Sequence, residues 1–213
     1  MPRLDPSERQ HLARGAARQV LAAGTTADKL TLRVVAQQAG MPLPTLTYVY
    51  GSVGELLDDL QLEFQSQAGA RQMLIGTGGL GKELLNQLRD YLTLLYADPS
   101  NIEIVRWQFL QVGRGEIVVP AGMTMVPLLR RIQERSGEKW RLSIDDLSTL
   151  AQAMISGLHA QFFVRGGDRP ALRIWWQEAR MVVDALVRLA EPGPRPANYR
   201  RIRLPAQVSK LDS

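Results

Sequence analysis

The side chains that most often carry out chemistry are scarce and far apart in this chain. Its 213 residues include no cysteine and only two histidines, His11 and His159. A cysteine nucleophile is therefore excluded, and an ordinary histidine metal site is not expected. The carboxylate pairs Asp58–Asp59 and Asp145–Asp146 fall in predicted helices, where adjacent side chains diverge by roughly 100°. We read them as solvated helix faces, and we predict no catalytic residue, no metal site and no cofactor.

A glycine-rich stretch, Gly76–Glu83, comes closest to a nucleotide-binding motif. It satisfies G-x-G-x-x-G and nearly satisfies G-x-x-x-x-G-K-[ST]. Both motifs need a preceding strand, whereas residues 54–75 have helical periodicity, and Glu83 stands where a hydroxyl would hold magnesium. We interpret the stretch as a linker between two helices, with a nucleotide site as the alternative.

The best-defined pattern lies in residues 31–57, which read TLRVVAQQAGMPLPTLTYVYGSVGELL. Apolar residues recur at helical spacing over 32–39, and Thr31 is placed to cap that helix. Gly40 accepts a positive φ, so it predicts a tight turn. A second short helix is expected over 44–50, with its prolines only at its start.

Within this stretch the order Thr-x-Arg, Ala-Gln, Ala-Gly, Pro-Thr-Leu, an aromatic pair and Ser-x-x-Glu-Leu-Leu resembles the DNA-binding module of the tetracycline-repressor-like (TetR) transcriptional regulators. The match covers roughly residues 1–60, and the later helices match by pattern only. The chain departs from the family at Thr47, Val49 and Val53, where ring-bearing or basic residues are usual. The resemblance implies an all-α fold of about nine helices with an N-terminal three-helix helix-turn-helix unit.

The resemblance also implies that the second helix of the motif enters the major groove of double-stranded DNA. Arg33, Thr45 and Tyr48 are our candidates for groove and base-edge contacts. The other candidates are expected to position the module, mainly on phosphates. The full set of candidate DNA-binding residues is Thr31, Arg33, Pro44, Thr45, Thr47, Tyr48 and Tyr50.

Charge is distributed unevenly along the chain, which carries +5 overall. Residues 1–53 hold six Lys and Arg against three Asp and Glu, whereas residues 54–190 hold fifteen against sixteen. A basic amino-terminal module suits a phosphate-binding surface, and a dimer would double its charge. Arg3 lies ahead of the first helix, either in a disordered terminus or as a minor-groove contact.

The carboxy-terminal stretch 191–213 is rich in proline and holds five basic residues against two acidic ones. This composition predicts a tail that is disordered or extended over its own or a neighbouring subunit. A second DNA contact is a further alternative. No apolar run approaches the ~20 residues that cross a bilayer, and no signal-peptide core is present. We therefore expect a cytoplasmic protein that does not enter membranes.

Two long helices, expected from Ser143 to about Gly166 and onward from Pro170, carry apolar residues on more than one face. A helix that is apolar on two sides needs two partners, and the resemblance implies that the second partner is another copy of the chain in a four-helix homodimer interface. The candidate interface residues are Leu158, Phe163, Trp175, Trp176, Val182, Val183 and Leu186.

Soft apolar residues with few polar neighbours gather in the predicted helices between residues 100 and 163. Such sets form small-molecule pockets, although they also form ordinary core. The candidate ligand-binding residues are Arg106, Trp107, Phe109, Met123, Met125, Met154, His159 and Phe162.

The sequence therefore predicts a DNA-binding domain over 1–53, a ligand-binding and dimerisation domain over 54–190, and a tail over 191–213. The expected function is a repressor that binds palindromic DNA as a homodimer and is released by a small, largely apolar effector. The helix of Ser52–Ile75 is the expected lever between the two domains. The alternative is a ligand-independent DNA-binding or protein-interaction module with a solid core.

Overall fold

The computed structural model describes residues 5–72, 78–113, 125–167 and 169–192. All regular secondary structure in these ranges is helical, so the predicted all-α fold is confirmed. None of the helices within them has the length and hydropathy to cross a membrane. The helices are α1 (Pro6–Ala22), η1 (Ala27–Lys29, a 3₁₀ turn), α2 (Leu32–Gln38), α3 (Leu43–Val49), α4 (Val53–Gln72), α5 (Gly79–Ala97), α6 (Pro99–Gly113), α7 (Val126–Ser136), α8 (Ile144–Val164) and α9 (Arg169–Ala190).

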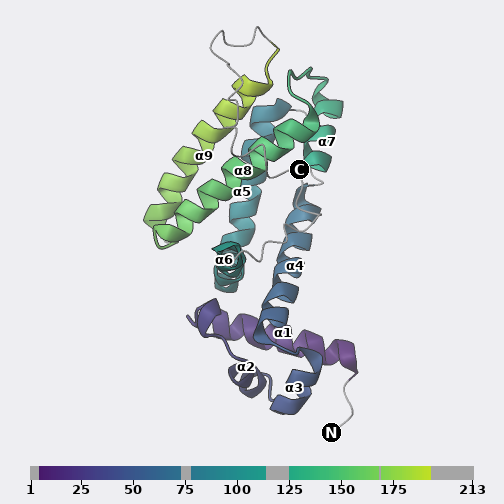
Figure 1. Ribbon diagram of the computed structural model, residues 1–213, viewed down its shortest axis with the longest axis vertical. Helices are drawn as coiled ribbons and strands as arrows, with labels where there is room; N and C mark the ends of the chain where they lie inside the picture. Colours follow the sequence, from purple (N-terminus) through teal and green to yellow (C-terminus); the bar gives the residue numbers. More distant parts are fainter. Residues whose placement is uncertain (1–4, 73–77, 114–124, 168, 193–213) are drawn as a thin grey trace, which may run out of the picture.

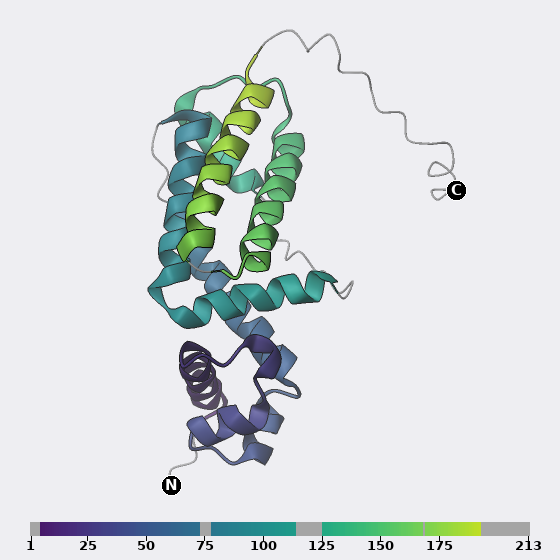
Figure 2. The ribbon, with the colours of Figure 1, turned by 90° about the vertical axis from the view of Figure 1, so that its left-hand side faces the viewer.

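The helices form two packed groups joined by α4 (Figure 1). Helices α1, α2 and α3 lie at one end, where α1 packs against both of the others. Helices α5, α7, α8 and α9 lie at the other end, with α8 and α9 side by side on its outer face. Figure 2 shows α6, in teal, lying crosswise between the two groups. Because α6 packs on α1, α4 and α5, it contacts both groups directly.

The small end of the molecule is held by a core of alanines and branched residues. Ala13, Ala17, Val35 and Leu46 are fully buried where α1, α2 and α3 meet. Small side chains on α1 let the two short helices approach closely, and their burial supplies most of the stabilisation that helices of seven residues lack by themselves. The short helices are therefore held by tertiary packing.

The turn between α2 and α3 has the geometry that the sequence predicts. Gly40 adopts a φ of 61°, and the N–H of Met41 donates to the carbonyl of Ala36 at 2.9 Å. The left-handed residue closes the end of α2, and Pro42 and Pro44 then begin α3, where missing N–H donors cost nothing.

Side-chain caps fix the starts of three helices, and the predicted cap at Thr31 is confirmed. The hydroxyls of Thr31, Ser52 and Ser143 accept backbone N–H donors at 3.1–3.3 Å. At the start of α1 the cap is Asp5, and Asp5 and Glu8 form a reciprocal capping box. A carboxylate accepts the orphan donor more strongly because it is charged.

The glycine-rich stretch is only partly a linker. Helix α5 already begins at Gly79, and the buried carboxylate of Glu83 accepts the backbone N–H of Gly78 at 2.9 Å. A negatively charged side chain therefore occupies the amide that a phosphate loop would present to its ligand. The element before the stretch is helix α4, as far as Gln72, where a nucleotide motif needs a strand.

A buried polar cluster fastens α1 to the start of α6. The Arg18 guanidinium donates to Asn101 Oδ1 at 2.9 Å and to Ser100 Oγ at 3.2 Å, and it pairs with Glu63 of α4 at 3.2 Å. Asn101 is 4% exposed and Ser100 is fully buried. Since buried polar groups are costly when unpaired, this cluster fixes how α1, α4 and α6 meet.

Replacing Arg18 with methionine should lower the free energy of unfolding by about 1–3 kcal/mol, because the substitution leaves buried acceptors unpaired. Urea denaturation followed by circular dichroism measures the change. Arg89→Met is the matched control: its side chain is 65% exposed beside Asp90, so it should cost less than about 1 kcal/mol. Equal losses in both variants would contradict a specific role for Arg18.

Candidate nucleic-acid interface and ligand cavity

The exposed side of α3 presents most of the residues that the sequence offers to DNA. Pro44 and Thr47 are exposed, Thr45 is half-buried, and the Tyr48 side chain is 85% exposed. Leu46 faces the opposite way and is fully buried against the core. The helix therefore presents a face of hydroxyl-bearing and aromatic residues, of a kind that contacts base edges and phosphates.

Around α3, the flanking candidates are also at the surface. Thr31 and Arg33 are exposed at the start of α2. The Thr47 hydroxyl donates to the Leu43 carbonyl at 3.0 Å, and Thr31 accepts from Val34, so each hydroxyl is already oriented. Lys29 is also exposed, two residues before Thr31, and the sequence reading missed it as a candidate. Its position in the turn before a capped helix was the available signal.

Tyr50 is not part of this exposed face, which corrects its assignment as a phosphate contact. Its side chain is 5% exposed, and its hydroxyl donates to the carboxylate of Asp59 on α4. Burial, with the hydrogen bond to Asp59, raises the pKa of Tyr50 above its ordinary value. The same carboxylate pairs with Arg14 of α1 at 3.4 Å. Tyr50 thus fastens the end of α3 to α4.

Asp58, the neighbour of Asp59, makes a different contact. Its carboxylate accepts the indole N–H of Trp107 on α6 at 3.0 Å. Trp107 is 8% exposed and is directed toward the start of α4, so it belongs to the α4–α6 junction and not to the ligand cavity as predicted. The reading of Asp58 and Asp59 as merely solvated is also corrected, because each carboxylate joins α4 to another helix.

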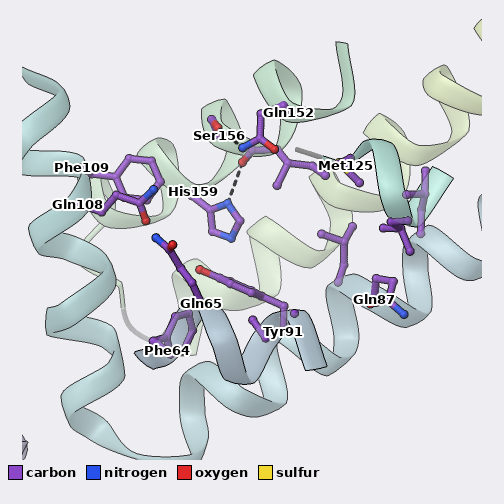
Figure 3. Close-up of a pocket in the computed structure, with 16 residues that line it drawn as sticks. Phe64, Gln65, Gln87, Tyr91, Gln108, Phe109, Met125, Gln152, Ser156 and His159 are labelled. Atoms are coloured by element: carbon purple, nitrogen blue, oxygen red, sulfur yellow. Dashed lines mark hydrogen bonds between the residues drawn. The ribbon is translucent and has the colours of Figure 1, made fainter. Parts of the chain in front are cut away.

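A cavity of about 150 Å³ lies among α4, α5, α6, α7 and α8. Apolar side chains make most of its wall, and neutral polar groups interrupt it, as in typical small-molecule sites (Figure 3). It is lined by Phe64, Gln65, Ala68, Gly69, Leu84, Gln87, Leu88, Tyr91, Gln108, Phe109, Met125, Leu128, Gln152, Ile155, Ser156 and His159.

Three of the eight predicted ligand-binding residues, Phe109, Met125 and His159, line this cavity. Phe162 is 2% exposed and packs in the core, and Met154 is half-buried on another part of α8. Neither belongs to the cavity wall. Met123 lies outside the described residues.

Arg106 also lies away from the cavity wall. It forms an ion pair with Glu103 at 2.9 Å and lies over the ring of Phe163 at 5.8 Å. Its charge is thus already compensated inside the subunit.

The sequence reading missed the contributions of α4 and α5. Phe64 and Gln65 enter from α4, and Gln87 and Tyr91 from α5. One signal was available: Gln87 lies on the buried, mostly apolar stripe of an amphipathic helix, and a neutral amide on a core-facing stripe needs a partner. The pairing of α4 with α8 across the cavity had no sequence signal.

His159 is the most perturbed group in the cavity. Its Nδ1 lies 2.9 Å from the carbonyl of Ile155, and it packs against the rings of Tyr91, Phe109 and Trp175. Burial lowers the pKa of His159 to about 4, against an ordinary value of 6.5. A carbonyl accepts only, so Nδ1 carries the proton and the Nε2 lone pair remains without a partner.

The predicted interface residues divide into two sets. Leu158, Trp175, Val183 and Leu186 are buried within the subunit, because α8 and α9 pack on each other and α9 packs on α5. Phe163, Trp176 and Val182 are half-buried against the same core. The exposed apolar side chains on these helices are others, namely Leu150, Val164, Ile174 and Met181, exposed by 38%, 88%, 42% and 71%.

Comparison with solved structures identifies the fold. A protein from Mesorhizobium loti MAFF303099, assigned to the TetR family of transcriptional regulators, aligns with a TM-score of 0.65 and 14% identity over 89% of this chain and 100% of its own. A second such protein, from Shewanella sp. PV-4, aligns with a TM-score of 0.54 and 14% identity over 87% of this chain and 99% of its own. The chain has the TetR fold.

A third structure with the TetR fold is the multidrug binding protein EbrR, in complex with imidazole. It aligns with a TM-score of 0.58 and 19% identity over 91% of this chain and 99% of its own. No protein-family model matches the sequence, and no curated protein matches it. The TetR resemblance seen in residues 31–57 thus extends, in three dimensions, to the helices that matched by pattern only.

The lowered pKa of His159 predicts acid sensitivity. The unfolded chain binds a proton near pH 6.5 and the folded chain only near pH 4, so stability is complete above 6.5 and is lost as pH falls toward 4. The loss should reach about 3 kcal/mol. Urea denaturation at several pH values, compared between the wild type and His159→Gln, isolates the contribution of His159 to the loss of stability. Parallel pH profiles for the two proteins would show that His159 does not titrate as proposed.

Proposed function

We propose that this protein is a transcriptional regulator, a repressor that binds palindromic double-stranded DNA as a homodimer and is released by a small effector. Residues 1–53 would form the DNA-binding domain and residues 54–190 the effector-binding and dimerisation domain. The observation that carries the proposal is Tyr48, an aromatic side chain 85% exposed on the second helix of a helix-turn-helix. Such a side chain has no packing role in its own subunit, whereas on this helix it can reach a DNA groove.

The charge of the exposed cations supports the same proposal. Arg14 and Arg18 form ion pairs within the subunit, whereas Lys29 and Arg33 are exposed beside α3. Two cations per subunit provide phosphate contacts, and a dimer provides twice that number. In such a dimer the two α3 helices would lie about 34–36 Å apart, the repeat of successive major grooves.

The effector would act through α6. Phe109 of α6 lines the cavity, and Trp107 of the same helix holds Asp58 of α4. Near its other end, Glu103 accepts the backbone N–H of Ala27 in η1 at 3.0 Å. A ligand that displaces Phe109 therefore moves a helix fastened to the DNA-binding end. The effector shifts the population of DNA-competent dimers only as far as it prefers one arrangement over the other. Together with α4, the expected lever, α6 provides the connection.

The alternative, a ligand-independent module with a solid core, is disfavoured by the cavity. A wall that leaves Gln87 Nε2 and His159 Nε2 buried without partners costs stability in an empty protein. A bound molecule that satisfies these groups removes that cost. We therefore prefer the ligand-responsive function.

Thr45→Ala and Tyr48→Ala should each weaken DNA binding about tenfold or more while the chain stays folded, because each removes a candidate DNA contact from α3. Gel-shift titration, with a duplex selected by the protein from a random pool, measures the affinity. Thr93→Ala is the matched control: its hydroxyl bonds to the Arg89 carbonyl on an exposed face of α5. Unchanged affinity in both α3 variants would rule out α3 as the reading helix.

We infer that the dimer forms through the exposed apolar residues of α8 and α9. Val164→Glu and Met181→Glu should convert a dimer to a monomer, because a carboxylate buried in an interface without a partner is costly. Sedimentation equilibrium at micromolar concentration gives the mass. Leu62→Glu, at a 57% exposed position on α4, is the control and should leave the mass unchanged. A monomeric wild type would refute the homodimer.

A further inference from the structure

The cavity wall is uncharged. Among its sixteen lining residues, all within the described parts of the chain, there is no Asp, Glu, Lys or Arg. Two lining residues, Tyr91 and His159, carry ionisable side chains. Burial raises the pKa of Tyr91 and lowers the pKa of His159, so both side chains stay neutral at physiological pH. A charged ligand entering this wall would lose its hydration without gaining a counter-charge.

The hydrogen-bonding character of the wall is fixed at one point. Nδ1 of His159 donates to Ile155, so Nε2 is an acceptor, and it is buried without a partner in a side chain only 7% exposed. An acceptor of this kind needs a hydrogen-bond donor, and an N–H or O–H group of a ligand in the cavity can supply it. Because the ring is held between other aromatic rings, the lone pair cannot turn away.

Side-chain amides are the other unpaired polar groups of the cavity wall. In Figure 3 the Gln65 amide and the Tyr91 hydroxyl point toward the same space as His159, and Gln87 lies farther along α5. Gln65 Nε2 and Gln87 Nε2 are also buried without partners. These amides can give or receive a hydrogen bond, whereas His159 can only receive one. The face of Phe109 lies nearly parallel to the imidazole, at 28° and 6.0 Å, so flat molecules suit this wall.

We propose that the effector is an uncharged, flat aromatic molecule of one or two rings that donates an N–H or O–H to Nε2 of His159. The size follows from a cavity of about 150 Å³, in the range that accepts a small aromatic molecule. Cationic and anionic aromatics of equal size are rejected because no lining residue neutralises them. This inference rests on the proposed function only in treating the cavity as the effector site.

The test compares matched probes by isothermal titration calorimetry on the full chain. Indole is compared with benzofuran, in which oxygen replaces the N–H, and 4-ethylphenol with 4-ethylanisole, in which a methyl group replaces the donor hydrogen. Each donor should bind about tenfold tighter than its partner, the usual value of one satisfied buried hydrogen bond. The two pairs distinguish N–H from O–H donors. Benzyltrimethylammonium and benzoate should not bind. Equal binding within both pairs, or tighter binding of either ion, would overturn the proposal.

Variants of His159 connect the preference to its acceptor. His159→Phe keeps an apolar ring but removes the acceptor, so the indole-to-benzofuran ratio should fall to about one. His159→Gln keeps an oxygen that can accept and should retain part of the ratio. His11→Phe, at the exposed second histidine, is the matched control. A merely structural role would change stability and leave the ratio intact, and an unchanged ratio in His159→Phe would refute the assignment.

A spectroscopic measurement decides the matter even if His159→Phe does not fold. In wild-type protein labelled with ¹⁵N histidine, the Nε2 resonance of His159 should shift upfield when indole is added and not when benzofuran is added. If the Nε2 resonance shifts neither with indole nor with 4-ethylphenol, the proposal is overturned.

The proposed regulation is tested separately. If donors bind but DNA affinity is unchanged, the ligand class stands and the effector role fails. If DNA binding responds only to probes without a donor, the proposed class of ligand is wrong, but the proposed function as a ligand-responsive regulator stands.

Discussion

The arrangement of the molecule depends on two adjacent carboxylates, Asp58 and Asp59 of α4. Because neighbouring residues of a helix diverge by roughly 100°, the two side chains reach different helices. Asp59 receives Tyr50 from the end of α3 and pairs with Arg14 of α1, whereas Asp58 receives the indole of Trp107 on α6. One turn of α4 therefore fixes both the helix-turn-helix and the crosswise helix above it.

These contacts are directional, in contrast to the apolar packing around them. Apolar side chains can slide past one another at modest cost, but a hydrogen bond to a carboxylate is lost when its geometry changes. The connections of α6 to Asp58, to Arg18 and to the backbone of η1 are all of this directional kind. A movement of α6 therefore either carries the small end of the protein with it or breaks several charged hydrogen bonds. This is a physical route by which a cavity can influence a surface more than one helix away.

The cavity itself is a compromise between stability and binding. A folded protein normally pairs its buried polar groups, and each one left unpaired costs about 1–3 kcal/mol. Here Gln65, Gln87 and His159 each keep an unpaired nitrogen. His159 is also held neutral among three rings, which favours an aromatic occupant over a charged one. The unpaired nitrogens lower the stability of the empty protein, and a ligand that forms hydrogen bonds to them gains binding free energy for the same reason.

Local patterns in the sequence determined most of the helices. Helical periodicity, the caps at Thr31, Ser52 and Ser143, and the Gly40 turn are effects of neighbouring residues, so they could be predicted without tertiary structure. The exposed face of α3 follows from the same periodicity. Tertiary structure alone decided which large apolar side chains of α8 and α9 are buried and which are exposed. It placed Trp175 in the core and Met181 at the surface, and it turned Trp107 and Tyr50 toward Asp58 and Asp59. It also brought α4 and α5 to the cavity wall opposite His159, because contacts between residues far apart in the chain depend on how whole helices pack and leave no period in the sequence.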